Sequence, residues 1–133
     1  MLSRETEERV RKHLRLARGL LETTALVEAS SEFEERNALS RAYYAVFHAC
    51  NALLLSHGME PSKSHGGLNK QIGRWRGRDF AQFMTNIYRL RTYADYDPLW
   101  IPVRHVNDSN LNTAWTNVLW ACAEAEQKLK NLL

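Results

Sequence analysis

Five alanines in one stretch of the chain constrain its fold more than any other feature. Larger apolar residues lie beside them, and a third set of positions is polar. At about 100° per residue the alanines fall on one narrow strip of a helix, where small side chains let a second helix approach closely. They are Ala38, Ala42, Ala45, Ala49 and Ala52. A helix with contacts on so many sides is expected at the centre of a helical bundle.

The stretch around these alanines has clear ends. Ser31 and Glu34 have the spacing of a capping box, and Gly58 followed by Pro61 is typical of the end of a helix. We therefore predict one long helix between these signals. Apolar residues also recur every three or four positions over residues 3–24, which predicts an amphipathic helix before it.

The second half of the chain shows further helical patterns. A short helix is expected over residues 65–72, and a basic turn follows at residues 74–78. A clear amphipathic helix then begins at Asp79 and ends before Pro98, because proline disfavours helix in the residue that precedes it. A last amphipathic helix is expected to begin at residues 108–109.

No β pattern and no long linker interrupts these helices. The chain is therefore predicted to form one all-α domain over residues 1–133, an antiparallel bundle of four to five helices. Its first residues are charged and no apolar run is long enough to span a bilayer, which predicts a cytoplasmic protein without a membrane segment. Cys50 and Cys122 lie inside helical patterns and are expected to be reduced core residues. Because Cys/His clusters, a P-loop and a dinucleotide glycine motif are absent from the sequence, neither a metal nor a cofactor is expected.

Arg41, Tyr44 and His48 form a polar line on the long helix. Arg41 and His48 are seven residues apart, so they project in nearly the same direction with Tyr44 between them. A guanidinium offers a planar fork to a phosphate, and a histidine titrates near neutral pH. Together they could cleave RNA without a metal: His48 would move a proton at the ribose 2′-hydroxyl or the leaving oxygen, while Arg41 would stabilise charge on the phosphate and Tyr44 would support them.

The same residues also fit a structural interpretation. Arg41 would then be a buried bracket paired with Asp95, and His48 would only satisfy a neighbouring polar group. On this interpretation Arg41→Ala destabilises the fold, because Asp95 loses its partner. The sequence leaves both roles open for Arg41.

Positive charge is concentrated between residues 63 and 91. This segment holds seven Lys or Arg residues and one acidic residue. It is either a solvated surface or a binding site for an anionic partner such as RNA or an acidic protein. The residues predicted to bind RNA phosphates are Lys63, Lys70, Arg74, Arg76 and Arg78.

Three segments give the chain a family resemblance. Residues 40–54 read SRAYYAVFHACNALL, residues 62–68 read SKSHGGL, and residues 89–97 read RLRTYADYD. In these segments the chain resembles HEPN-domain proteins, in a subgroup with the pattern SRxYYAxF and a later ADY. The resemblance implies a homodimeric helical bundle, frequently encoded beside a minimal nucleotidyltransferase as a toxin–antitoxin or defence pair.

Many HEPN proteins are metal-independent endoribonucleases with an arginine followed, after four to six residues, by a histidine. Arg41 and His48 fit the longest of these spacings. Ala42 stands where a polar residue is usual, and Cys50 stands where the toxins carry a modified tyrosine, so that modification site is not carried over. Two hypotheses follow: an RNA- or nucleotide-binding dimer with endoribonuclease activity, or a non-catalytic module that docks a nucleotidyltransferase partner.

Overall fold

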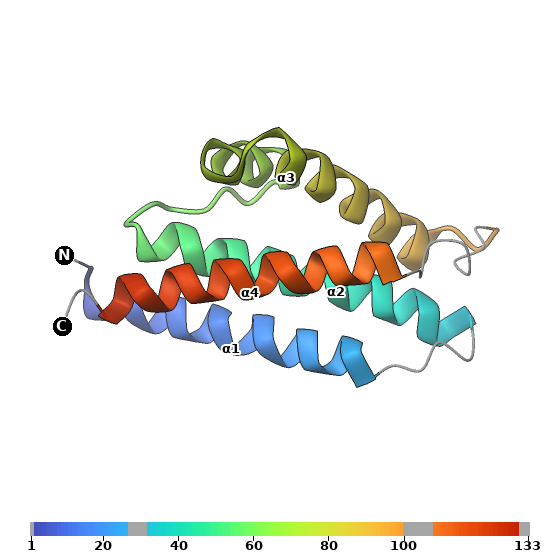
Figure 1. Ribbon diagram of the computed structural model, residues 1–133, viewed down its shortest axis with the longest axis horizontal. Coiled ribbons are helices and arrows are strands. Elements are labelled where there is room, and N and C mark those ends of the chain that lie inside the picture. The colour runs from blue at the N-terminus through green and yellow to red at the C-terminus, as the bar shows by residue number, and fades with distance from the viewer. Residues whose placement is uncertain (1, 27–31, 100–107, 131–133) are drawn as a thin grey trace.

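The computed structural model describes residues 2–26, 32–99 and 108–130, and within them it is all-helical with no strand. Four helices follow one another along the chain (Figure 1): α1 Arg4–Leu26, α2 Glu32–Ser56, α3 His65–Tyr96 and α4 Asp108–Lys130. Successive helices run in opposite directions. The predicted all-α antiparallel bundle is therefore confirmed.

Helix α1 begins as the sequence predicts. The backbone N–H of Thr6 donates to Oγ of Ser3 at 3.1 Å, which satisfies one of the free donors at the helix start. Glu5 and Glu7 lie in the first turn, where negative charge stabilises the positive end of the helix dipole. The apolar face predicted for this helix is buried: Val10, Leu14, Ala17 and Leu21.

Helix α2 is the centre of the bundle. Helices α1, α3 and α4 all pack against it, and all five alanines of the predicted strip are buried. The helix ends before Gly58, whose φ of 76° is the left-handed conformation expected of a glycine at this position. The predicted cap at Ser31 lies outside the described residues. Helix α2 is buried on most sides. Its polar line is therefore accessible to solvent only where the neighbouring helices do not cover it.

Helix α3 contains the break that the sequence places between two helices. The side chain of Ser64 accepts a hydrogen bond from the N–H of Gly67 and caps the start of the helix. Gly77, within the predicted basic turn, has φ 83° and ψ −169°, so the helix is kinked there. The second segment ends at Tyr96, just before Pro98, as predicted.

The remaining predictions for the core also hold. Cys50 and Cys122 are free and buried, and burial raises the pKa of both thiols, that of Cys122 to about 11.

In the described segments, no helix combines the length and apolar character that crossing a membrane requires.

Candidate functional site

The polar line of α2 lies between α1 and α3. Tyr44 is 38% exposed, and its ring lies 5.6 Å from the guanidinium carbon of Arg91 on α3. His48 instead contacts α1, and Arg41 is half-buried. The three predicted residues therefore share one face of α2, but Tyr44 contacts α3 whereas His48 contacts α1.

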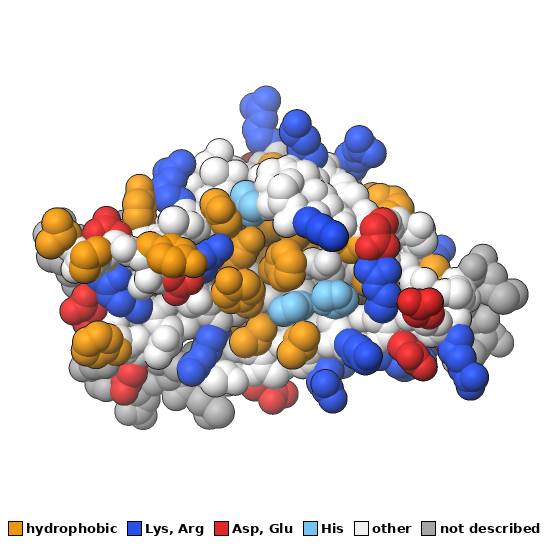
Figure 2. Space-filling view, turned by 180° about the vertical axis from the view of Figure 1, so that it is seen from behind, with side chains coloured by type: hydrophobic (Ala, Val, Ile, Leu, Met, Phe, Trp, Pro, Cys, Tyr) orange, Lys and Arg blue, Asp and Glu red, His pale blue; other side chains and the backbone are white. Residues whose placement is uncertain are grey.

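His48 contacts a second histidine, which no sequence pattern had indicated as part of the site. The Nδ1 atoms of His48 and His13, on α1, are 2.9 Å apart. The ring centroids are 5.1 Å apart, so the rings meet at their edges rather than stacking, in contrast to His65 and Tyr88, whose centroids are 4.0 Å apart. Figure 2 shows two histidine side chains side by side on this face, next to a group of hydrophobic side chains.

Both histidines of this pair are held in the neutral form. Burial, and to a lesser extent the neighbouring His13, lower the pKa of His48 to about 4. Burial and then the positive charge of Arg9 lower the pKa of His13. His48 is therefore a neutral imidazole at pH 7, able to accept a proton.

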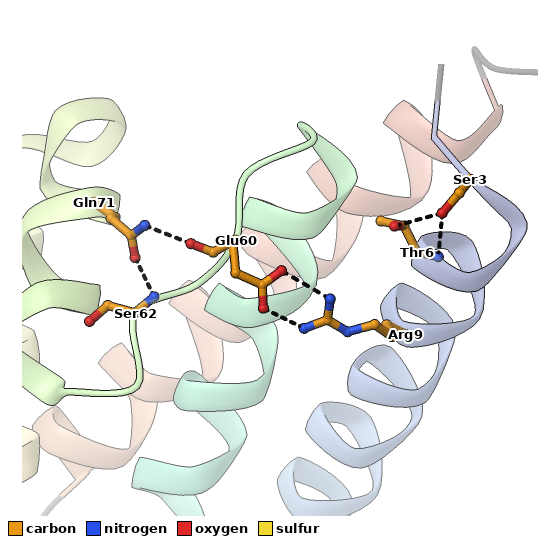
Figure 3. A network of polar contacts seen from close by, with 6 residues as sticks. All are labelled: Ser3, Thr6, Arg9, Glu60, Ser62 and Gln71. Atoms are coloured by element: carbon orange, nitrogen blue, oxygen red, sulfur yellow. Dashed lines mark hydrogen bonds and ion pairs between the residues drawn. The ribbon is translucent and has the colours of Figure 1, made fainter.

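Arg9 also belongs to a polar network that joins α1 to the connection between α2 and α3 (Figure 3). Its guanidinium makes two hydrogen bonds to the carboxylate of Glu60, at 2.7 and 3.0 Å. Gln71 on α3 donates to the carbonyl oxygen of Glu60 and accepts from the N–H of Ser62. This network fixes the start of α3 against α1. Its α1 residue, Arg9, lies about one helical turn before His13.

The predicted pair of Arg41 and Asp95 is not formed. The carboxylate of Asp95 lies 3.4 Å from a guanidinium nitrogen of Arg91, one turn earlier on the same helix, and 3.4 Å from Oγ of Ser40. Among the described residues no carboxylate pairs with Arg41. Asp95 has its own arginine on α3 because residues four apart face each other on a helix.

Arg91, rather than Arg41, is the largely buried arginine that pairs with Asp95. Its side chain is 14% exposed, and four tyrosine rings surround its guanidinium at 5.2 to 5.9 Å: those of Tyr43, Tyr44, Tyr88 and Tyr96. Such cation–π contacts stabilise a desolvated guanidinium. Tyr44 is thus shared between this cluster and the polar line of α2.

The basic residues predicted to bind RNA lie on α3 and just before it. Lys63, Lys70, Arg74, Arg76 and Arg78 are all exposed, and Lys and Arg side chains project along the edge that α3 forms in Figure 2. The ring of Trp75 lies 4.9 Å from that of His57. His57 follows the last residue of α2 and, like Trp75, lies beside Trp120 and Glu124 of α4. This part of the basic segment therefore lies beside α4, whereas His48 contacts α1.

An aromatic cavity lies beside the basic segment. It has a volume of about 240 Å³ and is lined by Leu53, His57, Trp75, Trp120 and Glu124. The guanidinium carbon of Arg76 lies 4.4 Å from the ring centroid of Trp120, and the side chain of Trp75 is 42% exposed. Exposed aromatic rings beside arginines are suited to stacking on unpaired bases.

Two known proteins are similar in sequence to this chain. No family model matches the chain. A Methanocaldococcus jannaschii protein named "Putative toxin MJ0605" is 29% identical over 102 residues, which cover 72% of this chain and 74% of that protein. A Pyrococcus horikoshii protein named "UPF0332 protein PH1297" is 33% identical over 92 residues; the match covers 69% of this chain but only 58% of that protein. The chain is thus similar, at modest identity, to a protein named as a toxin and to a UPF0332 protein, while its resemblance to HEPN domains remains a prediction.

Proposed function

We propose that this chain is the toxin of a toxin–antitoxin pair, a homodimer that binds RNA and cleaves it without a metal ion. One observation carries the proposal: His48 is a neutral, half-buried imidazole on the same face of α2 as Arg41, whose guanidinium has no described carboxylate partner. The similarity to a protein named as a toxin supports the same class of function.

The proposed reaction follows from the chemistry of these two side chains. His48 accepts the proton of a ribose 2′-hydroxyl, and the 2′-oxygen then attacks the adjacent phosphorus. The bond from phosphorus to the 5′-oxygen breaks and the 5′-oxygen takes a proton from solvent, which leaves a 2′,3′-cyclic phosphate and a 5′-hydroxyl. Arg41 stabilises the additional negative charge on the phosphate oxygens during this exchange.

The apolar surroundings of the histidine pair support dimerisation through this face. Leu16, three residues after His13 on α1, is 44% exposed, and Tyr44 is also exposed. The ring of Phe47 is only partly buried and lies 5.2 Å from that of His48. Exposed apolar groups around a polar centre are typical of protein interfaces. A symmetric dimer formed here would bring two Arg41–His48 pairs together.

The same apolar face also supports the second hypothesis, a non-catalytic module that docks a nucleotidyltransferase antitoxin. In that case His48 would be an interface residue and the chain would cut no RNA. Co-expression with the product of a neighbouring nucleotidyltransferase gene, followed by purification, tests this hypothesis. It expects a stable complex and no cleavage by the chain alone.

Cleavage of single-stranded RNA in EDTA tests the proposed function. The wild-type protein is expected to leave 2′,3′-cyclic phosphate ends, and His48→Ala is expected to abolish cleavage. Gln127→Ala is the control, because Gln127 is an exposed residue of α4 outside both the Arg41–His48 face and the basic segment. Equal cleavage by His48→Ala and wild type would reject the assignment of His48.

A further inference from the structure

We propose that His13 and His48 act as one proton-sharing pair, in which His13 fixes the tautomer of His48 and exchanges a proton with it. This inference concerns the site described under the proposed function, and its catalytic consequence rests on that function. The pair itself is a property of the fold and can be tested without RNA.

The geometry of the contact requires one shared proton. Two neutral imidazole nitrogens can lie 2.9 Å apart only if one carries a hydrogen and the other offers its lone pair. The edge-to-edge arrangement of the rings directs both Nδ1 atoms along the contact. One histidine of the pair is therefore protonated at Nδ1, and the other accepts that hydrogen.

The position of the shared proton determines which Nε2 atom of the pair can accept a proton and which can donate one. A neutral imidazole carries one hydrogen, so the histidine that donates from Nδ1 has a bare Nε2 that can accept a proton. The other histidine has its hydrogen on Nε2 and can donate it. Among the described residues no side chain or backbone group hydrogen-bonds to either Nε2 atom. The pair thus offers one proton acceptor and one proton donor, at the two outer ends of the contact.

The surroundings keep the pair neutral. The groups that influence it are Arg9 on α1, whose charge is partly balanced by Glu60, and the two histidines themselves; on α2 the neighbouring ring is that of Phe47. A second positive charge beside Arg9 is disfavoured, and each histidine disfavours protonation of the other. A single proton therefore moves between the rings more readily than two protons accumulate.

In the proposed cleavage the pair would transfer protons without a change in its net charge. The proton of the 2′-hydroxyl moves to the bare Nε2 of the donating histidine, as the oxygen–phosphorus bond forms. The Nδ1 hydrogen of that ring passes to Nδ1 of its neighbour. The neighbour releases its Nε2 proton to solvent, and the 5′-oxygen takes a proton from solvent as the second phosphorus–oxygen bond breaks. Both rings end neutral with their tautomers exchanged, and solvent restores the starting state.

Two variants separate the two roles of His13. In His13→Asn the side-chain amide can replace Nδ1 as a hydrogen-bond partner of His48, but it cannot pass a proton on. In His13→Phe an aromatic ring still fills the position, but the hydrogen bond to Nδ1 of His48 is lost. Because His13 acts through His48, we expect cleavage to fall about 10²-fold in the phenylalanine variant and by less in the asparagine variant.

Two-bond ¹H–¹⁵N spectra of the histidine rings test the pair directly. At pH 7 we expect one of these two histidines to carry its hydrogen on Nδ1 and the other on Nε2, and we expect His13→Phe to return His48 to the tautomer mixture of an ordinary histidine. Identical Nε2–H tautomers for both, unchanged by His13→Phe, would overturn the proposal, as would a stoichiometric metal ion bound between the two Nδ1 atoms. If the tautomers are as expected but wild type leaves RNA intact, the pair stands and the ribonuclease function fails.

Discussion

Arg91 and Asp95 pair with each other one turn apart on α3, and this pairing leaves Arg41 without a carboxylate partner in the described part of the chain. Arg41→Ala is therefore expected to leave the melting temperature close to that of the wild type. The same variant should lose about 10²-fold or more in the rate of RNA cleavage, because it removes the positive charge that stabilises the phosphate. Thermal unfolding and a cleavage assay measure the two effects separately.

Asp95→Asn is the control for this prediction. Asp95 contacts Arg91, whose guanidinium is largely buried among tyrosines, so the variant should lower stability by about 1 kcal/mol. A large fall in melting temperature for Arg41→Ala, similar in size to that for Asp95→Asn, would restore the buried-bracket interpretation, in which these two residues pair.

The lowered pKa of His48 predicts a loss of stability in mild acid. In the unfolded chain the pKa returns to about 6.5, so between pH 6.5 and about 4 the unfolded state binds more protons than the folded state. The neutral histidine therefore contributes stability above pH 6.5, and this contribution is lost as the pH falls towards 4. The melting temperature of wild type should fall between pH 7 and pH 5, and it should fall less in His48→Asn. An equal fall in both proteins would contradict the prediction.

The alanine strip of α2 predicts a strong response to larger side chains. Ala45 is fully buried at the centre of the bundle, so Ala45→Leu should overpack the core and cost roughly 1–3 kcal/mol of stability. Ala123→Leu, at an exposed position of α4, is the matched control and should change stability little. Denaturant unfolding measures both; equal stability of the two variants would show that the strip is not closely packed.

The aromatic cavity beside the basic segment predicts a role for Trp75 in RNA affinity. Loss of one stacking ring costs about 1–3 kcal/mol per base, so Trp75→Ala should weaken binding of single-stranded RNA about tenfold or more. Trp115 on α4 is exposed to a similar degree, and Trp115→Ala serves as the control. If both variants bind a fluorescent oligonucleotide as tightly as wild type, the surface around Trp75 is not the RNA-binding site.

Local sequence patterns predicted most of the fold but only part of the candidate site. The buried face of α1, the alanine strip of α2 and the break at Gly77 could all be predicted, because each depends on residues a few positions apart in the sequence. Contacts between helices could not. His13 and His48 are 35 residues apart, and no spacing rule relates them. The partner of Asp95 was also mispredicted: Arg91, four residues earlier on the same helix, is a local partner that the spacing alone could have indicated.

Arg41 and His48 are proposed to form one metal-independent site for RNA cleavage. Single-turnover cleavage of single-stranded RNA in EDTA by wild type, Arg41→Ala, His48→Ala and the double variant tests it most directly. We predict a loss of about 10²-fold or more in each single variant and a loss in the double variant well short of the product of the two, because the residues act on the same phosphate. Cleavage at the wild-type rate by either single variant, or none by the wild-type protein itself, would contradict the claim.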